Sequence, residues 1–319
     1  MKAIVIQDYG EPDVLQIETV ADPTPKTGEV VVRLHAAGVN PVETYQRAGT
    51  PPYNTTPLPF TPGSDGAGTI AAIGEGVAGF DIGDRVYVYA PRGGGTYAEM
   101  IACPATQIHR LPDSVSFEQG AAMGVPYATA HRALFGKAGA KMGEVVFIHG
   151  ASGGVGTAAI QLAKRAGLVV AGTASDEDFI EQVGAKYTFN HNVEGYMSDA
   201  LGATCGRGFD VILEMLANEN LGADPDVLAP FGRIVVIGNR GEVTVNPRAW
   251  MGRDATIYGM MLFNVSPAQS QEIHADLVKG LESGELKPII GQTFDLADAA
   301  KAQIAVVQGE SHGKIVLTM

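Results

Sequence analysis

The stretch HGASGGVGTAAIQLAKRAG, from His149 to Gly167, restricts the possible folds of this chain more than any other segment. The apolar residues before it, Val145–Ile148, predict a short strand. After the glycines, small and apolar residues recur at the spacing of one helical face, at Ala159, Leu162, Ala163 and Ala166. The stretch is therefore predicted to be a strand, a glycine-rich turn and a helix in succession.

Three glycines of the turn, Gly150, Gly153 and Gly156, stand at every third position. Glycine lets the backbone turn sharply, approach a ligand closely and bring the helix close to its strand. The helix then presents unpaired N–H groups and the positive end of its dipole, which together attract a pyrophosphate. A glycine triplet alone is equally typical of a tight turn without a ligand, so the rest of the chain has to decide.

Length and charge narrow the classes of protein to which the chain can belong. Its 319 residues predict two domains rather than a single core. No apolar run reaches the roughly 20 residues of a membrane span, and the first residues lack the layout of a signal peptide, so we expect a cytoplasmic protein that binds no membrane. The formal net charge of -13 disfavours nucleic acid as a partner. Two cysteines, Cys103 and Cys205, are too few for a disulfide framework.

The hydrophobic pattern changes twice along the chain. Over residues 1–122, short apolar segments alternate with turn signals such as Pro51-Pro52 and Gly93-Gly94-Gly95, which predicts a mainly β domain. Over residues 123–264, apolar strands alternate with helical patterns, which predicts an α/β domain with a parallel sheet covered on both faces. Its strands are expected at Val145–Ile148, Leu168–Ala171, Tyr187–Asn190, Val211–Leu213, Ile234–Ile237 and Thr256–Gly259.

Gly150 then falls at the first strand-to-helix turn of a doubly wound fold, where such folds bind phosphate, and a dinucleotide site is predicted there. Residues 265–319 continue with a helix over Ala268–Ser283, the segment LKPIIGQTFDL, a second helix and the strand GKIVLTM. A terminal strand without a partner of its own is expected to return to the first domain. The predicted domains are therefore 1–122 together with 265–319, around an inserted domain over 123–264.

Eight short strings spread over nearly the whole chain resemble those of one family: AGVNPVETYQRAGT, LPFTPGSDGAG, GDRVY, GGTYAE, HGASGGVG, EMLANENL, NPRAW and LKPIIG. They are similar to the zeta-crystallin-type quinone oxidoreductases, a zinc-free branch of the medium-chain dehydrogenase/reductase superfamily. The resemblance implies an α/β fold in which a split, mainly β, GroES-like catalytic domain holds an inserted Rossmann domain. It also implies an enzyme that transfers a hydride from NADPH to a quinone or a similar conjugated carbonyl acceptor.

The same resemblance implies the cofactor contacts residue by residue. Besides Gly150 they fall on Tyr45, Ser152, Gly153, Gly154, Val155, Ser175, His191, Asn218, Ile237, Gly238, Asn239, Arg240, Met260, Met261 and Leu262. Two departures concern the 2′-phosphate of NADPH. Relatives often carry glycine where this chain has Ser175, and the segment DEDF that follows it has no basic residue nearby.

The choice between NADPH and NADH rests on the second strand of the inserted domain. A NAD-specific Rossmann domain carries Asp or Glu at the end of that strand. Here the strand predicted at Leu168–Ala171 runs into residues 172–175, GTAS, without a carboxylate. The acidic residues 176–178 oppose NADPH unless they only complement the dipole of the next helix. We expect NADPH to be preferred, with His191 at its phosphate by resemblance, while NADH remains usable.

For the substrate, the resemblance implies only Asn40, Tyr45 and Tyr53, near the nicotinamide. Each has a structural alternative. Asn40 precedes Pro41 and is a natural turn residue, while the tyrosines can be core or rim residues that keep their hydroxyls in water. His149 ends a strand and is expected to be a satisfied structural histidine rather than a catalyst.

Zinc-dependent relatives in the superfamily supply cysteine and histidine ligands from segments that here read AAGVNP, PGSDGAG and RGGGTYAE. None of the three contains a cysteine or a histidine, so no metal site is expected. Without a Lewis acid the chain can scarcely activate an alcohol, but it can still transfer hydride to an acceptor that is already electrophilic. Quinones and conjugated enones meet this requirement, so a small molecule of this kind is the expected partner.

Other functions stay open at this point. An enone, alkenal or enoyl-thioester reductase can use the same scaffold, and the sequence does not separate it from a quinone reductase. Zeta-crystallins also resemble lens structural proteins and RNA-binding proteins, a non-enzymatic alternative that the intact glycine turn and the acidic charge disfavour. The segment ATIYGMMLF, Ala255–Phe263, predicts an apolar edge strand covered by a second copy, so a homodimer or homotetramer is expected.

Overall fold

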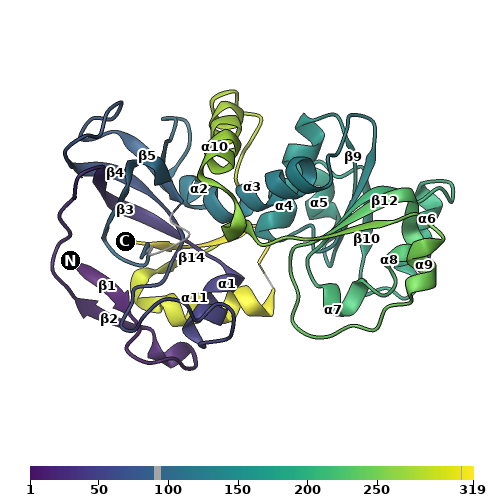
Figure 1. Cartoon of the computed structure of the whole chain (residues 1–319), viewed down its shortest axis with the longest axis horizontal. Coiled ribbons are helices and arrows are strands. Elements are labelled where there is room, and N and C mark those ends of the chain that lie inside the picture. The colour runs from purple at the N-terminus through teal and green to yellow at the C-terminus, as the bar shows by residue number, and fades with distance from the viewer. Residues whose placement is uncertain (90–94, 310) are drawn as a thin grey trace. The chain divides into compact units, whose positions relative to one another are not determined.

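The computed structural model describes residues 1–89, 95–309 and 311–319 (Figure 1). The chain divides into two compact units, of which unit 1 comprises Met1–Pro126 and Pro267–Met319 and unit 2 comprises Tyr127–Ser266. Among these residues, no helix is long and apolar enough to cross a membrane. Most of the turn predicted from Gly93-Gly94-Gly95 lies outside the described residues.

Unit 1 is built on a seven-stranded sheet, most of whose strands pair in the antiparallel sense. Its order is β14-β15-β3-β4-β5-β7, and β6 also pairs with β3. Every second residue along the start of β3 is a buried aliphatic one, because alternate side chains of a strand face the same side of the sheet: Val30, Val32 and Leu34. The strands are β3 (Glu29–Val39), β4 (Asp65–Ile73), β5 (Arg85–Tyr89), β6 (Met100–Pro104), β7 (Ile108–Arg110), β14 (Ile290–Asp295) and β15 (Lys314–Thr318).

The terminal strand β15 lies in the interior of this sheet. It pairs in parallel with β14 and antiparallel with β3, where Ile315 faces Val39 and Thr318 faces Ala36. The C-terminal residues thus complete a sheet that the N-terminal residues begin. The remaining elements of unit 1 are the hairpin β1 (Lys2–Val5) and β2 (Gln16–Thr19), and the helices η1 (Pro12–Val14), α1 (Pro41–Arg47), η2 (Ala105–Gln107), α2 (Phe117–Ala121), α10 (Pro267–Glu282), η5 (Leu296–Asp298) and α11 (Ala299–Gln308).

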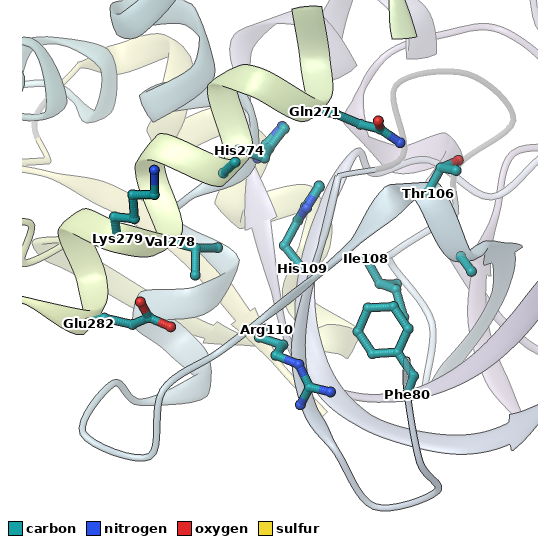
Figure 2. A pocket seen from close by; sticks show the side chains of 12 residues that line it. Phe80, Thr106, Ile108, His109, Arg110, Gln271, His274, Val278, Lys279 and Glu282 are labelled. Atoms are coloured by element: carbon teal, nitrogen blue, oxygen red, sulfur yellow. The ribbon is translucent and has the colours of Figure 1, made fainter. Parts of the chain in front are cut away.

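A pocket of about 450 Å³ lies between β7 and α10 in unit 1 (Figure 2). The ring of His109 stacks on that of His274 at 4.1 Å between centroids and is tilted against Tyr87 at 5.0 Å. The Tyr87 hydroxyl and His274 Nδ1 are 2.9 Å apart and share a hydrogen bond. The pocket is lined by Phe80, Ala105, Thr106, Ile108, His109, Arg110, Gln271, His274, Ala275, Val278, Lys279 and Glu282.

Unit 2 holds six parallel strands in the order β10-β9-β8-β11-β12-β13. This is the 3-2-1-4-5-6 order of the Rossmann fold, which confirms the predicted fold class. Three strands are longer than the apolar runs from which they were predicted: β9 continues to Ala174, β11 extends to Phe209 and Glu214, and β12 begins at Leu228. The strands are β8 (Val145–Ile148), β9 (Val169–Ala174), β10 (Tyr187–Asn190), β11 (Phe209–Glu214), β12 (Leu228–Val236) and β13 (Thr256–Gly259).

The helix predicted after the glycine turn is α4 (Gly154–Arg165), which packs on β8 and β9. Its predicted apolar face is confirmed, since Ala159, Leu162 and Ala163 are almost completely buried. Unit 2 begins at Tyr127, within α3 (Gly124–His131), and continues with the π-helix η3 (Arg132–Lys137). Its other helices are α5 (Glu177–Val183), α6 (Tyr196–Ala203), α7 (Ala217–Asn220), α8 (Asp224–Val227), α9 (Pro247–Met251) and η4 (Leu262–Asn264).

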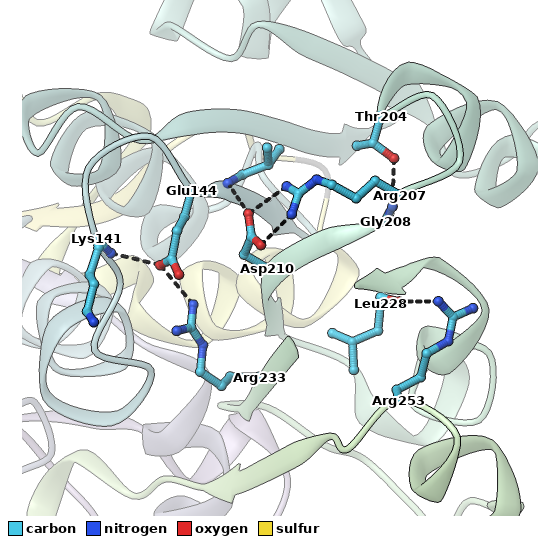
Figure 3. A network of polar contacts seen from close by, with 10 residues as sticks. Lys141, Glu144, Thr204, Arg207, Gly208, Asp210, Leu228, Arg233 and Arg253 are labelled. Carbon is cyan, nitrogen blue, oxygen red and sulfur yellow. Dashed lines mark hydrogen bonds and ion pairs between the residues drawn. The ribbon is translucent and has the colours of Figure 1, made fainter. Parts of the chain in front are cut away.

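Polar contacts tie three neighbouring strands of unit 2 together (Figure 3). Glu144, just before β8, accepts a hydrogen bond from Arg233 of β12 at 2.8 Å. Asp210 of β11 accepts from the Val145 N–H at 2.8 Å and from both terminal nitrogens of Arg207 at 2.7 Å. Glu144 and Asp210 lie at the amino ends of β8 and β11, and Arg233 lies within β12.

Candidate dinucleotide site

The glycine turn directly follows β8, and its glycines meet different demands. Gly150 has a φ of +60°, a left-handed conformation that favours glycine. A Cβ atom on Gly156 would lie 2.4 Å from the Gly150 carbonyl oxygen, so the close packing of α4 on its strand excludes any side chain there. A Cβ atom on Gly153 would meet only that oxygen, at an ordinary 3.6 Å. The packing of the fold does not exclude a side chain at position 153, and glycine there is consistent with the predicted close approach of a ligand.

The residues predicted to hold the pyrophosphate, Ser152–Val155, form the entry to α4. Gly153 is the N-cap residue, and all four residues are only partly buried. The first helical hydrogen bond runs from the Thr157 N–H to the Gly153 carbonyl at 2.8 Å. The N–H groups of a first helical turn lack partners within the helix and attract anions. The residues present therefore fit the pyrophosphate of a dinucleotide.

Two predicted contacts follow the next strands. Ser175 comes directly after β9 and His191 directly after β10, and both are exposed. The Asn190 side-chain amide donates to the Ser175 carbonyl at 3.1 Å, which ties these two strand ends together. Burial lowers the pKa of His191, and the positive charge of His149 lowers it further. Because β9 continues to Ala174, Ser175 stands at the true end of the strand.

The carboxylates after Ser175 begin the next helix. Asp176 is the N-cap of α5, and its side chain accepts a hydrogen bond from the Phe179 N–H at 3.1 Å. Glu177 and Asp178 follow in the first turn, where negative charge complements the helix dipole. The acidic run thus has a local structural role.

Two loops, one after β11 and one after β12, carry the next predicted contacts and are hydrogen-bonded to each other. The Asn218 side-chain oxygen accepts from the Arg240 N–H at 2.9 Å, and the Ala217 N–H donates to the Gly238 carbonyl at 3.0 Å. A Cβ atom on Gly238 would lie 2.1 Å from the Met215 carbonyl oxygen, so only glycine permits this approach. Ile237 and Gly238 are partly buried, while Asn239 and Arg240 are exposed.

Met260, Met261 and Leu262 follow β13, and Arg132 fixes the path of their backbone. The Arg132 guanidinium donates to the Met261 carbonyl at 2.5 Å and to the Leu262 carbonyl at 3.3 Å. The Met260 N–H donates to the Val236 carbonyl at 3.0 Å. Arg132 was not predicted, because nothing in the local sequence connects it with a segment 129 residues later.

The predicted substrate residue Asn40 belongs to unit 1 and is 2% exposed. Its amide nitrogen donates to Glu43 Oε1 at 3.0 Å and to Asp65 Oδ2 at 2.9 Å, and its oxygen accepts from the Lys314 ammonium. Burial raises the pKa of the Glu43 and Asp65 carboxyls and lowers the pKa of Lys314. This geometry favours a positioning role for Asn40, and its contact with substrate stays a prediction.

The buried network around Asn40 also occupies the segments AAGVNP and PGSDGAG, which supply zinc ligands in relatives. Asp65 Oδ2 and the Lys314 nitrogen are 3.4 Å apart, so a cation of the chain itself accompanies the carboxylate. The third segment, RGGGTYAE, lies partly outside the described residues. Glu43 had a recognisable signal, since an acidic residue three positions after an N-cap closes a capping box. Lys314 had none.

The predicted pair Tyr45 and Tyr53 is close in space. Their ring centroids are 5.3 Å apart, with the planes tilted by 34°, and both side chains are partly buried. Burial raises the pKa of Tyr53, and the neighbouring Tyr45 raises it further. Both phenols belong to unit 1, as Asn40 does, and the predicted dinucleotide contacts other than Tyr45 belong to unit 2.

Comparisons with known proteins agree with this architecture. Residues 26–113 match the alcohol dehydrogenase GroES-like domain, and residues 183–317 match the zinc-binding dehydrogenase family. Among solved structures, a NAD-dependent alcohol dehydrogenase has a TM-score of 0.93 at 30% identity, covering 100% of both chains. A mycobacterial protein in complex with NADPH has a TM-score of 0.90 at 28% identity, covering 100% of both chains.

Several sequence relatives carry the name quinone oxidoreductase. The quinone oxidoreductase of Homo sapiens is 42% identical over 100% of this chain and 98% of its own. The quinone oxidoreductase of Pseudomonas aeruginosa is 32% identical over 99% of both chains. A solved quinone oxidoreductase of Pseudomonas syringae pv. Tomato DC3000 has a TM-score of 0.89 at 32% identity, covering 100% of this chain and 99% of its own. The chain therefore belongs to the quinone oxidoreductase family of zeta-crystallin type, within the medium-chain dehydrogenase/reductase superfamily.

Proposed function

We propose that this oxidoreductase transfers a hydride from NADPH to a quinone or a similar conjugated carbonyl compound. The observation that carries the proposal is the glycine turn of unit 2, in which Gly153 leaves space that the fold does not need. The full-length relatives named quinone oxidoreductase support this acceptor class. An enone or enoyl reductase is the second candidate, because the CurK enoyl reductase shares the fold at a TM-score of 0.90 and 27% identity.

When bound, NADPH supplies the hydride, and the protein holds the cofactor and the acceptor in a productive orientation. The N–H groups of Gly154 and Val155 would hold the pyrophosphate, and the loops with Asn218 and Ile237–Arg240 would hold a further part of the cofactor. Fixing two reactants in a productive orientation removes much of the entropy cost of a bimolecular step. Tyr45 and Tyr53 contact the acceptor. The Tyr53 phenol is protonated at neutral pH, as phenols ordinarily are. Burial raises its pKa further, which favours donation of a hydrogen bond to the reduced oxygen over loss of the proton.

The preference for NADPH over NADH rests on Ser175 at the strand end and on His191. Asp176 is 20 residues after Gly156, about the distance at which an acidic residue contacts a ribose 2′-hydroxyl, but its side chain caps α5. Asp176→Asn keeps an N-cap residue and removes the charge, so it should increase kcat/KM for NADPH relative to NADH. A wild-type preference for NADH at both pH 6 and pH 8 would contradict the assignment.

An acceptor panel tests the reaction itself. Quinones of graded size, conjugated enones and enoyl thioesters are offered with NADPH, and oxidation of the cofactor is followed together with product analysis. Turnover of quinones above the other classes supports the proposal. Preferential reduction of a carbon–carbon double bond would establish the second candidate, and binding of NADPH without turnover of any acceptor would favour a non-enzymatic role.

A further inference from the structure

Three buried ionisable side chains meet beneath the dinucleotide turn of unit 2. His149 follows β8, Glu214 ends β11 and Asp224 begins α8. From β8 the chain builds the sheet outward through β9 and β10 and then returns to β11 on the other side of β8. The ends of β8 and β11 are therefore the topological switch point, above which doubly wound sheets bind their ligands.

In the cluster of His149, Glu214 and Asp224, two carboxylate oxygens receive no hydrogen bond from the described residues. His149 Nε2 lies 2.9 Å from Asp224 Oδ1 and 3.5 Å from Glu214 Oε2. All three residues are at most 2% exposed. Glu214 Oε2 and Asp224 Oδ2 have no hydrogen-bond donor among the described residues. One imidazolium thus faces two carboxylates, and the cluster carries one uncompensated negative charge when all three groups are ionised.

Burial makes this uncompensated negative charge energetically unfavourable, because it is removed from water. Burial raises the pKa of Glu214, and the negative charge of Asp224 adds to the effect, while His149 and the Leu216 N–H counteract it. Burial alone would lower the pKa of His149, but its hydrogen bond to Asp224 and the charges of both carboxylates outweigh burial and raise it. Glu214 is consequently the group of the cluster with room for a further proton.

Hydrogen bonds connect the cluster to the segments that carry the predicted cofactor contacts. Glu214 Oε1 accepts from the Leu216 N–H at 2.5 Å and from the Asn220 amide at 3.3 Å. The Glu214 carbonyl accepts from the Ile237 N–H at 2.8 Å. These bonds set the two loops that hold Asn218 and Ile237–Arg240, while His149 directly precedes Gly150.

We propose that His149, Glu214 and Asp224 position the dinucleotide loops as one unit, and that Glu214 takes up a proton when the anionic cofactor binds. The reason is electrostatic, because a pyrophosphate above the switch point adds negative charge next to a cluster that already has a surplus. Uptake of one proton makes the cluster neutral. This inference rests on the proposed function, since it needs a dinucleotide at the glycine turn.

Two further titratable groups face the cluster. Burial raises the pKa of Tyr196 on α6, and the charges of Asp224 and Glu214 raise it further, so this phenol stays neutral. His191 lies near enough for the charge of His149 to lower its pKa, and it can itself bind a proton when a 2′-phosphate arrives. NADH lacks that phosphate, so a comparison of NADH with NADPH separates the proton of His191 from the proton of Glu214.

Calorimetry measures the proton directly. Wild-type protein is titrated with NADPH and with NADH at pH 7 in buffers of different ionisation enthalpy, and the slope of binding enthalpy against ionisation enthalpy counts protons taken up. We expect uptake with both cofactors, limited to one proton for NADH. Glu214→Gln keeps an acceptor for the Leu216 N–H and should abolish the uptake seen with NADH. His191→Gln is the matched control, which should retain that uptake.

Kinetics provide a second readout. Glu214→Gln should raise KM for the cofactor roughly tenfold, more than it lowers kcat, because it disturbs binding loops rather than the reacting atoms. Asp224→Asn serves if Glu214→Gln does not fold, and it should likewise diminish the proton count.

Separate outcomes overturn the two proposals. If neither dinucleotide binds the wild-type protein, the proposed function is wrong and this inference fails with it. Binding without a buffer-dependent enthalpy, or equal uptake in wild type and Glu214→Gln, overturns this inference alone. A divalent ion that copurifies stoichiometrically with wild type and is lost from Glu214→Gln would also overturn it, since the ion would then neutralise the cluster.

Discussion

Gly153 and Gly156 stand three residues apart in the same turn, yet a side chain at each would meet different surroundings. Gly153→Val places its side chain where only the Gly150 carbonyl is near, at 3.6 Å from Cβ. We expect this variant to fold and to lose most of its affinity for NADPH, because the branched side chain occupies the pyrophosphate position. Fluorescence titration with NADPH, alongside circular dichroism, tests both statements.

Gly156→Ala is the matched control for that experiment. Its methyl group would lie within 2.6 Å of backbone atoms of Gly150 and Ala151, so the helix has to move away from its strand. Its melting temperature should fall further than that of Gly153→Val, which loses only a favoured N-cap residue. NADPH affinity unchanged in folded Gly153→Val would refute the assignment of the turn.

His109 offers a pH test in unit 1. Burial lowers its pKa to about 4, from the usual value near 6.5. Between these values the unfolded chain binds the proton first, so the contribution of His109 to the unfolding free energy is present above pH 6.5 and is lost as the pH falls to about 4. The loss is at most about 3.5 kcal/mol, because each pKa unit corresponds to about 1.4 kcal/mol.

His109→Gln removes this titration, although it also loses the stacking on His274 at every pH. We expect the melting temperature of wild type to fall more steeply than that of the variant between pH 6.5 and 4. Parallel pH curves for the two proteins would contradict the lowered pKa.

Residue-level prediction succeeded where the cause was local. The glycine turn was recognisable because strand, turn and helix follow one another within about 20 residues. The partners of Asn40 were not recognisable, because Lys314 reaches it from 274 positions later in the chain. Glu214 and Asp224 were missed for a similar reason, since buried charge depends on tertiary packing.

At the scale of elements, we predict that the protein self-associates through β13, the last strand of the unit 2 sheet. β13 pairs with β12 on one side, and Ile257 within it is 44% exposed. An uncovered apolar edge strand readily pairs with a second copy. Ile257→Lys puts a charge on that edge and should convert the assembly to a monomer, as measured by light scattering at micromolar concentration.

Met142→Lys is the control for this prediction. Met142 is 83% exposed and lies outside every strand, so its replacement should leave the molar mass unchanged. A wild-type monomer, or a mass unaffected by Ile257→Lys, would exclude β13 as the interface.

Strand positions followed from sequence better than strand lengths. β8, β10 and β13 have the bounds that were predicted for them. β9 continues through Gly172, which pairs with Ile148 of β8, and Thr173, which pairs with Phe189 of β10. Both are buried, although both residue types are also typical of turns. Pairing with neighbouring strands decides such cases, and a single sequence does not contain it.

At the scale of the whole molecule, we predict that the enzyme works without a bound metal. Asn40 and Asp65 lie in segments from which zinc-dependent relatives draw ligands, and here the Lys314 ammonium accompanies them. Dialysis against a strong chelator should change neither the melting temperature nor the NADPH-dependent reduction of quinones, because no folding energy depends on a metal. Activity that is lost on dialysis and restored by added zinc would contradict this prediction.

β15 contains residues 314–318 of the 319, and yet it lies inside the sheet of unit 1. During synthesis, one edge of β3 over Ala36–Val39 stays unpaired until Lys314–Thr318 have been made. Unit 2 is complete by Ser266 and can close earlier. A chain truncated just before Lys314 would have a finished Rossmann unit and an open strand edge on β3, which favours aggregation with other chains.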